Sequence, residues 1–371
     1  MSIDYGKILI VDGSYMLHRS LHVKQVFELK TKTGLRAGAV FNFLRSLDLE
    51  TNKNAGYMPI VVWDAGLAKR RLEINPDYKH HAERQKEQSD VDAGLVEPDK
   101  DAQEYIQQYV SQRGIINSFL DILGVPHIRV KGWEGDDIMY TLTRLSHDNI
   151  LLTDDKDLIQ MLSPKTKISR PMHEDILVYD EYQKTHDDPT MRKFIMRKAL
   201  VGDGSDNIPG VAKGLGIKAA ELIVDIIYNN PDNWKEILLD PKQKKGLGAP
   251  KVRKFVKEQG LDWESWADEF TAPDPETGKS KSLPPFLGFL KNYDQFDKNV
   301  KMTDLSLELP FISKELLDYI SQCIVTGLKT PNYFSFMAKA AQYEFSKLDT
   351  QGIIQRMTST ISNYKMENGI K

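Results

Sequence analysis

The sequence predicts an α/β fold: a mostly parallel central sheet flanked by helices, followed by a helical C-terminal lobe. Three observations support this prediction. Short β-branched runs alternate with helical patterns through the first half of the chain. Acidic residues follow each of these runs, and after Pro189 the pattern becomes helical. We expect the strands of the first half to pair in parallel, because helices connect them.

Four runs have the length and composition of buried strands, namely residues 7–11, 60–63, 127–130 and 149–153. Apolar residues recur at helical spacing in the segments between and after them. These predicted helices are residues 39–49, 105–123, 135–145 and 158–162. The alternation is typical of βαβ units, whose strands share one sheet.

A chain of 371 residues exceeds the usual size of a single hydrophobic core, so we expect two lobes. Residues 1–189 form the first lobe, with a polar arch or loop at about 67–100. Residues 190–371 form the helical lobe. It contains a helix-turn-helix at about 191–230 and a lysine-rich segment at 242–257.

Composition indicates an ordinary soluble globular protein, with 40% hydrophobic and 28% charged residues. No apolar run approaches the roughly 20 residues that span a bilayer, and the N-terminal segment lacks the features of a secretion signal. Cys323 is the only cysteine, which excludes an internal disulfide and fits a reducing compartment. We therefore expect a cytoplasmic protein.

Charge is unevenly distributed, although the net charge is only −3. Residues 69–86 hold six Lys or Arg against three acids, and residues 242–257 hold seven and no acid. A basic run is most often a solvated face. These runs indicate a nucleic-acid partner only in combination with an acidic site.

Carboxylates follow all four predicted strands: Asp12, Asp64, "EGDD" at 134–137 and "DDKD" at 154–157. The carboxyl ends of parallel strands converge on one crevice. Each acid has an alternative reading as a helix cap. A cluster of carboxylates repels itself, because like charges about 4 Å apart cost several kcal/mol per pair at an effective dielectric near 20. A divalent cation would relieve that repulsion.

Oxygen ligands favour Mg²⁺ or Mn²⁺, whereas zinc would require Cys or His at ligand spacing, which the sequence lacks. The carboxylates are too many for one six-coordinate ion. We therefore predict two Mg²⁺ ions, with Mn²⁺ able to substitute, and the two-metal hydrolysis of a phosphodiester.

The stretch "VGDGSDNIPGV", residues 201–211, places Asp203 and Asp206 in a glycine-rich turn between two predicted helices. Such residues also make ordinary turns, which is the alternative. We expect the aspartates to bind cation while the backbone N–H groups beside them hold a phosphate without reading sequence. The residues predicted to contact duplex DNA here are Gly210, Lys213, Gly214, Gly216 and Lys218.

Together, "VDGSYMLHR", "VVWDAG", Tyr78-Lys79, "EGDD", "TDDKDLIQML" and "GDGSDNIPGV" resemble the 5′→3′ exonuclease and flap endonuclease family. The resemblance is greatest to bacteriophage ribonuclease H-type members and covers about the first 230 residues. It implies a PIN-like nuclease core that removes 5′ ends, 5′ flaps and RNA primers from duplex DNA during replication. A phage-encoded chain would act in the host cytoplasm.

The resemblance also implies which residues hold metal. The first cluster falls on Asp12, Asp64, Glu134, Asp136 and Asp155, and the second on Asp137, Asp157, Asp203 and Asp206. Asp154 is left out, because it occupies a place that the family keeps small or neutral. Asp155 is expected among the catalytic residues, with Lys79 and Arg71.

Basic and aromatic residues complete the implied site. Lys79 corresponds to the arch lysine at the scissile phosphate, and Arg19 and Arg71 correspond to positions that meet the 5′ strand. Tyr78 would stack on a base near the cleavage point, with ordinary packing as the alternative. The family often has an arginine where this chain has Ala82, so Arg84 is the candidate in its place.

Two other functions stay open: a metal-dependent endoribonuclease of related fold, and a non-catalytic DNA-end-binding protein. A polymerase clamp or a single-strand DNA-binding protein is the partner that the resemblance suggests for the helical end. The role of residues 232–300 is open, because they match nothing in the family pattern.

Overall fold

The computed structural model describes residues 4–27, 29–79, 100–240, 271–273, 275, 277–278, 283 and 285–370. The chain forms two compact units. Unit 1 comprises Met1–Lys69, Lys86–Asp187 and Glu308–Lys371, and unit 2 comprises Arg70–Gln85 and Asp188–Leu307. Residues 80–99 of the predicted arch and the lysine-rich segment 242–257 lie outside the described residues. The predicted division at residue 189 stays a prediction.

Unit 1 is built on a six-stranded sheet with the order β3-β2-β1-β4-β5-β6. The first five strands in that order are parallel, and β6 is antiparallel to β5. The strands are β1 Lys7–Asp12, β2 Met58–Trp63, β3 His127–Arg129, β4 Asp148–Leu152, β5 Thr166–Arg170 and β6 Asp175–Leu177. The predicted, mostly parallel sheet is therefore confirmed.

The central strands form because their side chains are apolar and lie inside the unit on both faces of the sheet. Residues 8–11 of β1 are 0% exposed, and every residue of β2 is buried. The ring of Trp63 in β2 stacks on Phe43 of a covering helix, with ring centroids 5.7 Å apart. This core fixes the strand register, and with it the positions of the residues that follow each strand.

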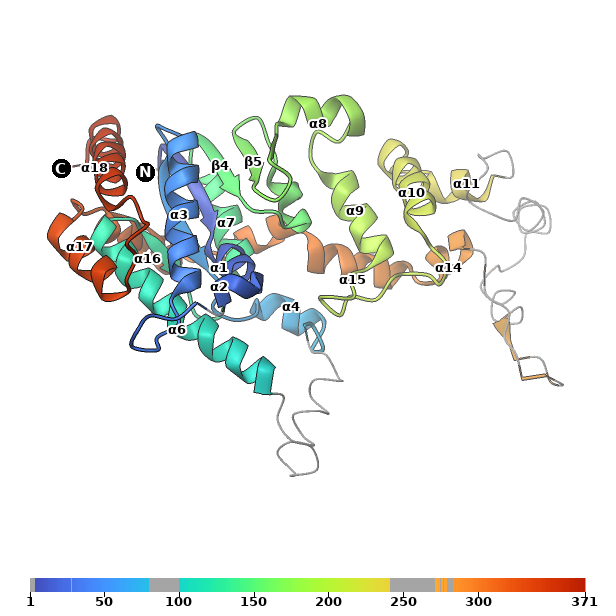
Figure 1. Cartoon of the computed structure of the whole chain (residues 1–371). Coiled ribbons are helices and arrows are strands. Elements are labelled where there is room, and N and C mark those ends of the chain that lie inside the picture. Colours follow the sequence, from blue (N-terminus) through green and yellow to red (C-terminus); the bar gives the residue numbers. More distant parts are fainter. Residues whose placement is uncertain are drawn as a thin grey trace. The chain divides into compact units, whose positions relative to one another are not determined.

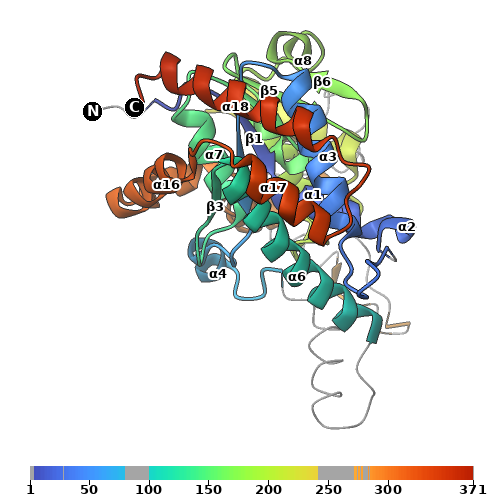
Figure 2. The same ribbon diagram turned by 60° about the vertical axis from the view of Figure 1, so that its left-hand side comes forward.

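Helices enclose this sheet and account for most of the remaining residues of unit 1 (Figures 1 and 2). In chain order they are α1 Gly13–His22, α2 Lys24–Phe27, α3 Gly38–Lys53, α6 Lys100–Leu123, α7 Gly135–Arg144, the 3-10 helix η1 Lys156–Met161, α8 Tyr179–His186, α16 Lys314–Gly327, α17 Tyr333–Gln342 and α18 Thr350–Glu367. Helices α1, α3 and α6 pack on one another, and α7 packs on β1, β2 and β4. No helix among the described residues combines the length and apolarity that crossing a membrane requires.

The C-terminal helices belong to the same unit as the N-terminal strand. Tyr364 of α18 donates a hydrogen bond to the main-chain oxygen of Tyr5 at 2.6 Å. Arg356 of α18 forms a bidentate ion pair with Asp48 of α3, with both N–O distances 2.7 Å. Such paired, fork-shaped bonds are specific in direction. The last helices therefore help to complete the core around the sheet.

Unit 2 is helical. Its elements are the greater part of α4 Lys69–Ile74, then α9 Arg192–Val201, α10 Ile217–Asn229, α11 Trp234–Leu239, α14 Pro285–Lys291 and α15 Tyr293–Thr303. A 3-10 helix, η2 Leu305–Phe311, follows α15. Helix α9 packs on α10 and α15, and α10 packs on α14. Two helices thus flank the glycine-rich turn, as the sequence predicts, and the helical C-terminal region is confirmed.

Candidate metal centre and phosphate-binding turn

The predicted acids of unit 1 lie at one edge of the sheet because their strands are parallel and in close register. Asp12 is the last residue of β1 and pairs in register with Val62, two residues before Asp64. Val11 pairs with Leu152, the last residue of β4. Asp12, Asp64 and the loop after β4 therefore emerge side by side.

Asp12 combines a structural and an electrostatic role. It caps α1, since its Oδ1 accepts a hydrogen bond from Tyr15 N at 2.9 Å. Its Oδ2 accepts a hydrogen bond from Thr153 Oγ1 at 3.0 Å. A side chain at Gly13 would lie 2.7 Å from Val61 Cγ1, so glycine is what lets α1 begin directly at the strand end.

Asp64 is held against the start of α7. Its Oδ1 accepts a hydrogen bond from Gly135 N at 2.7 Å, and a Cβ at Gly135 would lie only 2.8 Å from that oxygen. Glu134, which is 3% exposed, accepts a hydrogen bond from Ala68 N at 3.4 Å. Asp136 and Asp137 occupy the first turn of α7, where the positive end of the helix dipole favours carboxylates.

Asp155 projects from the loop after β4 and caps η1, because its Oδ1 accepts a hydrogen bond from Asp157 N at 2.8 Å. Its own N–H donates to Thr153 Oγ1 at 3.1 Å. Thr153 thus links Asp155 to Asp12 through a single hydroxyl. The side chain of Asp155 is exposed, whereas that of Asp12 is buried.

The electrostatic environment of the Asp12 carboxyl opposes its ionisation. Burial, together with repulsion from Asp64 and Asp155, raises the pKa of Asp12 from 3.8 to about 7, against the lowering effect of its hydrogen bonds. Carboxylate oxygens are the ligands that Mg²⁺ and Mn²⁺ prefer, and a bound cation would reverse this repulsion. The donor set of unit 1 therefore fits a divalent metal centre.

Asp154 is engaged away from that cluster. Tyr15 donates its hydroxyl hydrogen to Asp154 Oδ2, and Met172 N donates to the same oxygen at 3.0 Å. Burial and the Asp154 carboxylate both raise the pKa of Tyr15 above its ordinary value. These bonds join α1 and the loop after β4 to the connection between β5 and β6.

In unit 2, Asp203 and Asp206 lie in the turn between α9 and α10. The Asp203 carboxylate accepts hydrogen bonds from the Ser205 hydroxyl at 2.5 Å and pairs with Lys198 Nζ at 3.0 Å. Partial burial raises the pKa of Asp203, but the Ser205 and Lys198 interactions outweigh it and bring the pKa to about 2. Asp203 is therefore ionised at neutral pH, as a metal ligand must be.

Close backbone approach explains two glycines of this turn. Gly202 has φ +79°, and a Cβ there would lie 2.4 Å from Gly210 N. A Cβ on Gly210 would lie 2.6 Å from Val201 O. Lys213 and Lys218, which flank the start of α10, are exposed, as are Gly214 and Gly216. The turn therefore presents two lysines and two glycines to solvent, although the Gly216 N–H already donates to Gly214 O at 3.0 Å.

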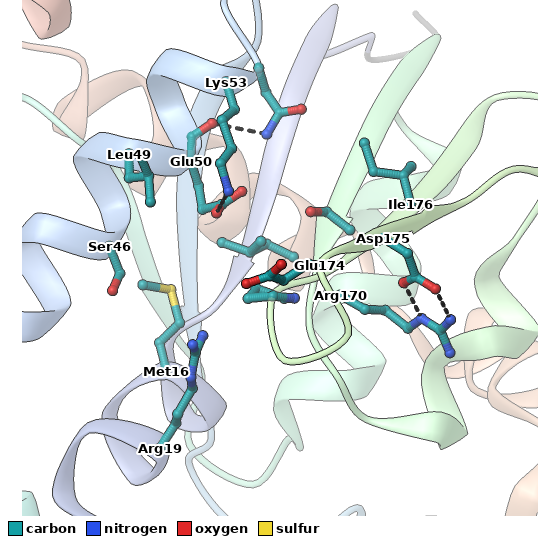
Figure 3. A pocket seen from close by; sticks show the side chains of 14 residues that line it. Met16, Arg19, Ser46, Leu49, Glu50, Lys53, Arg170, Glu174, Asp175 and Ile176 are labelled. Atoms are coloured by element: carbon teal, nitrogen blue, oxygen red, sulfur yellow. Dashed lines mark hydrogen bonds and ion pairs between the residues drawn. The ribbon is translucent and has the colours of Figure 1, made fainter. Parts of the chain in front are cut away.

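The predicted basic residues have different surroundings. Arg19 on α1 is half-buried and lines a cavity of about 580 Å³ between α1, α3 and the β5–β6 hairpin (Figure 3). Arg170 and Asp175 on that hairpin are paired to each other, as are Lys53 and Glu50 on α3 (Figure 3). The contact of Arg19 with the 5′ strand stays a prediction.

Arg71 and Tyr78 are buried within unit 2, each about 2% exposed. Arg71 Nε donates to Met302 O at 3.0 Å, and Tyr78 packs beside the turn, with its hydroxyl 3.5 Å from Asp206 Oδ2. This burial favours a structural role for both side chains. Their predicted contacts with DNA stay predictions, and Arg84 lies outside the described residues.

A group of stacked rings beside Asp64 was absent from the sequence prediction. The His18 ring on α1 lies 4.4 Å from the ring of Tyr109 and 5.8 Å from that of Tyr105, both on α6. Asp64 acts electrostatically on both His18 and Tyr109. Two tyrosines four residues apart on one helix were a usable signal, but the histidine partner becomes visible only once α1 and α6 pack.

Residues 7–188 match the model of the 5′-3′ exonuclease, N-terminal resolvase-like domain, which spans the sheet and the acidic cluster of unit 1. Residues 7–188 therefore carry a 5′-3′ exonuclease N-terminal domain. The family resemblance of the sequence motifs is thereby confirmed.

Relatives of this chain include DNA polymerase I of two bacteria. The thermostable enzyme of Thermus thermophilus is 31% identical over 223 residues, covering 59% of this chain and 24% of the polymerase. That of Streptococcus pneumoniae is 29% identical over 268 residues, covering 68% of this chain and 28% of the polymerase. The chain thus spans about a quarter of the length of these relatives.

Solved structures show the same fold. The bacteriophage T5 protein co-crystallized with metal ions has a TM-score of 0.57 at 17% identity, covering 86% of this chain and 99% of the T5 chain. The T5 flap endonuclease in a pseudo-enzyme-product complex with DNA and metal ions has a TM-score of 0.54, also at 17% identity, covering 87% of this chain and 100% of the T5 chain. The predicted fold class is therefore confirmed beyond the matched exonuclease domain.

Proposed function

We propose that this protein is a structure-specific 5′ nuclease, acting as a 5′→3′ exonuclease and a flap endonuclease. Its substrates would be duplex DNA with a 5′ end, a 5′ flap or an RNA primer. The observation that carries the proposal is the convergence of Asp12, Asp64 and Asp155 at one sheet edge inside the matched family domain.

The residues of unit 1 have distinct tasks in this proposal. Asp12, Asp64, Glu134, Asp136 and Asp155 would hold the first metal ion. The Asp12 carboxylate is constrained, since one oxygen accepts a hydrogen bond from Tyr15 N in α1 and the other from Thr153 Oγ1 after β4. Such constraint fixes ligand direction before metal binds, which lowers the reorganisation needed at the site.

A second ion would be held by Asp137, Asp157, Asp203 and Asp206. When bound, two divalent ions activate water and stabilise the leaving oxygen in phosphodiester hydrolysis. Mg²⁺ is proposed as the physiological ion and Mn²⁺ as a substitute, because the donors are all oxygens. Support for divalent metal also comes from T5 5′-exonuclease, whose structure contains bound zinc ions.

The protein would bind DNA through its phosphates, without recognising the base sequence. The N–H groups at Gly210 and Gly214 would seat one phosphate, with Gly216, whose own N–H donates to Gly214 O at 3.0 Å, lining the seat, and Lys213 and Lys218 would add sequence-independent attraction. The Lys79 ammonium would lie at the scissile phosphate and offset charge that develops during cleavage. Removal of primers and flaps places the protein in DNA replication.

Partners and location are also proposals. A polymerase clamp or a single-strand DNA-binding protein would bring the nuclease to its substrate, through the helical C-terminal region. A cytoplasmic location, in the host if the chain is phage-encoded, fits the single cysteine and its reduced state.

The test compares labelled blunt duplex, 5′-flap duplex and RNA-primed duplex, each with Mg²⁺, with Mn²⁺ or with chelator. We expect cleavage near the 5′ junction only when metal is present, leaving 5′-phosphate products. Preferential cleavage of single-stranded RNA would support the endoribonuclease instead. Tight binding of duplex ends without cleavage would support a non-catalytic end-binding protein.

A further inference from the structure

Two asparagine side chains fasten the residues after α4 to the glycine-rich turn of unit 2. We call residues 75–79 the arch foot. Asn75 Nδ2 donates to Asn207 O at 3.3 Å, and Asn207 Nδ2 donates back to Asp77 O at 2.8 Å. Lys79 N adds a main-chain hydrogen bond to Asp206 O at 3.0 Å. Asn75 and Asn207 together form what we call the asparagine clasp.

Backbone conformation on both sides of the clasp is unusual. Asn207 has φ +55° and Lys79 has φ +54°. The left-handed region is unfavourable for residues with a Cβ, by roughly 1–2 kcal/mol, and asparagine tolerates it better than lysine. Such conformations persist where surrounding interactions hold them, and they gather at functional sites. The clasp supplies such interactions at Asn207, and the main-chain bond from Lys79 N to Asp206 O supplies one at Lys79.

Both apolar packing and polar contacts hold the arch foot on the turn, since Tyr78 is 2% exposed and its hydroxyl lies 3.5 Å from Asp206 Oδ2. A cavity of about 350 Å³ lies beside the clasp and is lined by Asn75, Asp77 and Asn207, together with residues of α15. Upstream, two arginines of α4 donate to main-chain oxygens of α15, so α4 itself is fixed separately. Beyond α4, the amide hydrogen bonds of the clasp add direction to a segment that Tyr78 also anchors by its burial.

The proposed phosphate-contacting lysine follows the clasp directly in the arch foot. Lys79 Nζ lies 4.0 Å from Asp206 Oδ1 and 5.2 Å from the centre of the Tyr78 ring. Its side chain remains 33% exposed, which leaves the ammonium accessible to a phosphate. Any shift of the arch foot relative to the turn would move this ammonium with it.

We propose that Asn75 and Asn207 are positioning residues that fix Lys79 to the turn that grips the duplex. Seating of a duplex in the turn would then place the Lys79 ammonium at the scissile phosphate in the same event. This inference rests on the proposed nuclease function. It predicts that loss of the clasp lowers kcat, because the lysine is misplaced, while duplex affinity stays the same.

The test uses variants that separate the amide from the backbone conformation. Asn75→Ala removes one donor. Asn207→Gly keeps the left-handed conformation available without an amide, and Asn207→Asp keeps the shape but cannot donate. Asn230→Ala is the matched control, since it removes an amide that bonds Ile226 O at 3.0 Å at the far end of α10. Thermal unfolding reports whether each variant folds.

Single-turnover cleavage of a 5′-flap duplex in Mg²⁺ and binding of the same duplex in chelator are then measured. We expect each clasp variant to lose about tenfold or more in kcat, since small misplacement of a catalytic group is costly. Duplex affinity should change by less than about twofold. Equal losses of affinity and kcat, or an Asn207→Asp variant as fast as wild type, would overturn the proposal.

Combination with Lys79→Ala identifies the target of the clasp. If Asn75 and Asn207 act through Lys79, adding Asn207→Gly to Lys79→Ala slows cleavage little further, because coupled residues are non-additive. If the double variant instead loses cleavage rate by the product of the two single losses, the clasp acts elsewhere and the inference is overturned. A wild-type protein that binds but never cleaves the flap would instead refute the proposed function.

Discussion

Asp12 at the end of β1 accepts a hydrogen bond from Thr153, the residue that follows β4, with 3.0 Å between Asp12 Oδ2 and Thr153 Oγ1. Through Thr153 this carboxylate is linked to Asp155, whose N–H donates to the same hydroxyl. The bond holds a buried acid beside two other acids. The fold therefore keeps like charges together at the site where metal is proposed to bind.

The first prediction concerns Asp12→Asn in metal-free protein. The pKa of Asp12 is raised by burial to about 7, so ionisation above that pH destabilises the fold. The protonated Asp12 side chain contributes its full stability to the fold below about pH 4. This contribution declines as the pH rises and is lost above about pH 7. Since one pKa unit corresponds to about 1.4 kcal/mol, the loss is at most about 4 kcal/mol.

Asparagine can still cap α1 but does not ionise. In chelator at about pH 8, Asp12→Asn should therefore unfold at a higher temperature than wild type, and at about pH 4 the difference should vanish. Mg²⁺ should raise the unfolding temperature of wild type much more than that of the variant. Parallel unfolding temperatures across this pH range would contradict the assignment of a strained, buried acid.

The second prediction concerns Asp155→Asn, which replaces an exposed carboxylate at the proposed first metal. Asparagine can keep the cap on η1, so folding should be unaffected. We expect cleavage of a 5′-flap duplex to fall by at least about a thousandfold, an effect of the size seen when an essential group is removed, with flap binding in chelator nearly unchanged. Retained turnover in Mg²⁺ would refute the metal assignment.

The sequence predicts the four strands of the sheet and the acids after them because apolar β-branched runs and strand-end polarity are local features. Residues 166–170 and 175–177 escaped prediction, since β5 and β6 contain Lys, Ser, Arg and Asp among few apolar residues. These strands are set by pairing with β4 and with each other, which is a tertiary effect. The composition of these two segments therefore does not indicate that they pair in the sheet.

Long-range packing explains the remaining differences at the site. The sequence could not show that Tyr78 and Arg71 would be buried, because their neighbours come from the turn and from α15. Nor could it show that α18 would bond to Tyr5 across 359 positions of the chain. The acids were predictable because each follows its own strand, whereas their hydrogen-bond partners come from other strands and helices.

The third prediction tests the phosphate-binding turn through Lys213→Gln. An exposed lysine that contacts a phosphate releases a counterion on binding, so its loss should weaken duplex binding at low salt about equally for all sequences. The slope of log affinity against log salt should become shallower by about one. Lys329→Gln, an exposed lysine of unit 1, is the control. An unchanged slope would count against this turn as the duplex track.

The fourth prediction concerns the stacked rings beside Asp64. His18 is exposed and lies against Tyr109 and Tyr105, so an unstacked base near the cleaved phosphate could extend the stack. Stacking of a base on an aromatic side chain is worth about 1–3 kcal/mol and tolerates any sequence. We therefore expect His18→Ala to weaken flap binding by about tenfold and to reduce quenching of 2-aminopurine placed next to the cleavage site.

Two further variants separate stacking from structure in this prediction. Tyr105→Phe removes the hydroxyl that bonds His18 Nδ1 at 2.5 Å but keeps the ring, so quenching should persist. Phe334→Ala removes a ring that is 83% exposed on α17, and we expect no effect on quenching. Because alanine is a good helix former, His18→Ala should leave α1 folded. Undiminished quenching in His18→Ala would show that the rings only join α1 to α6.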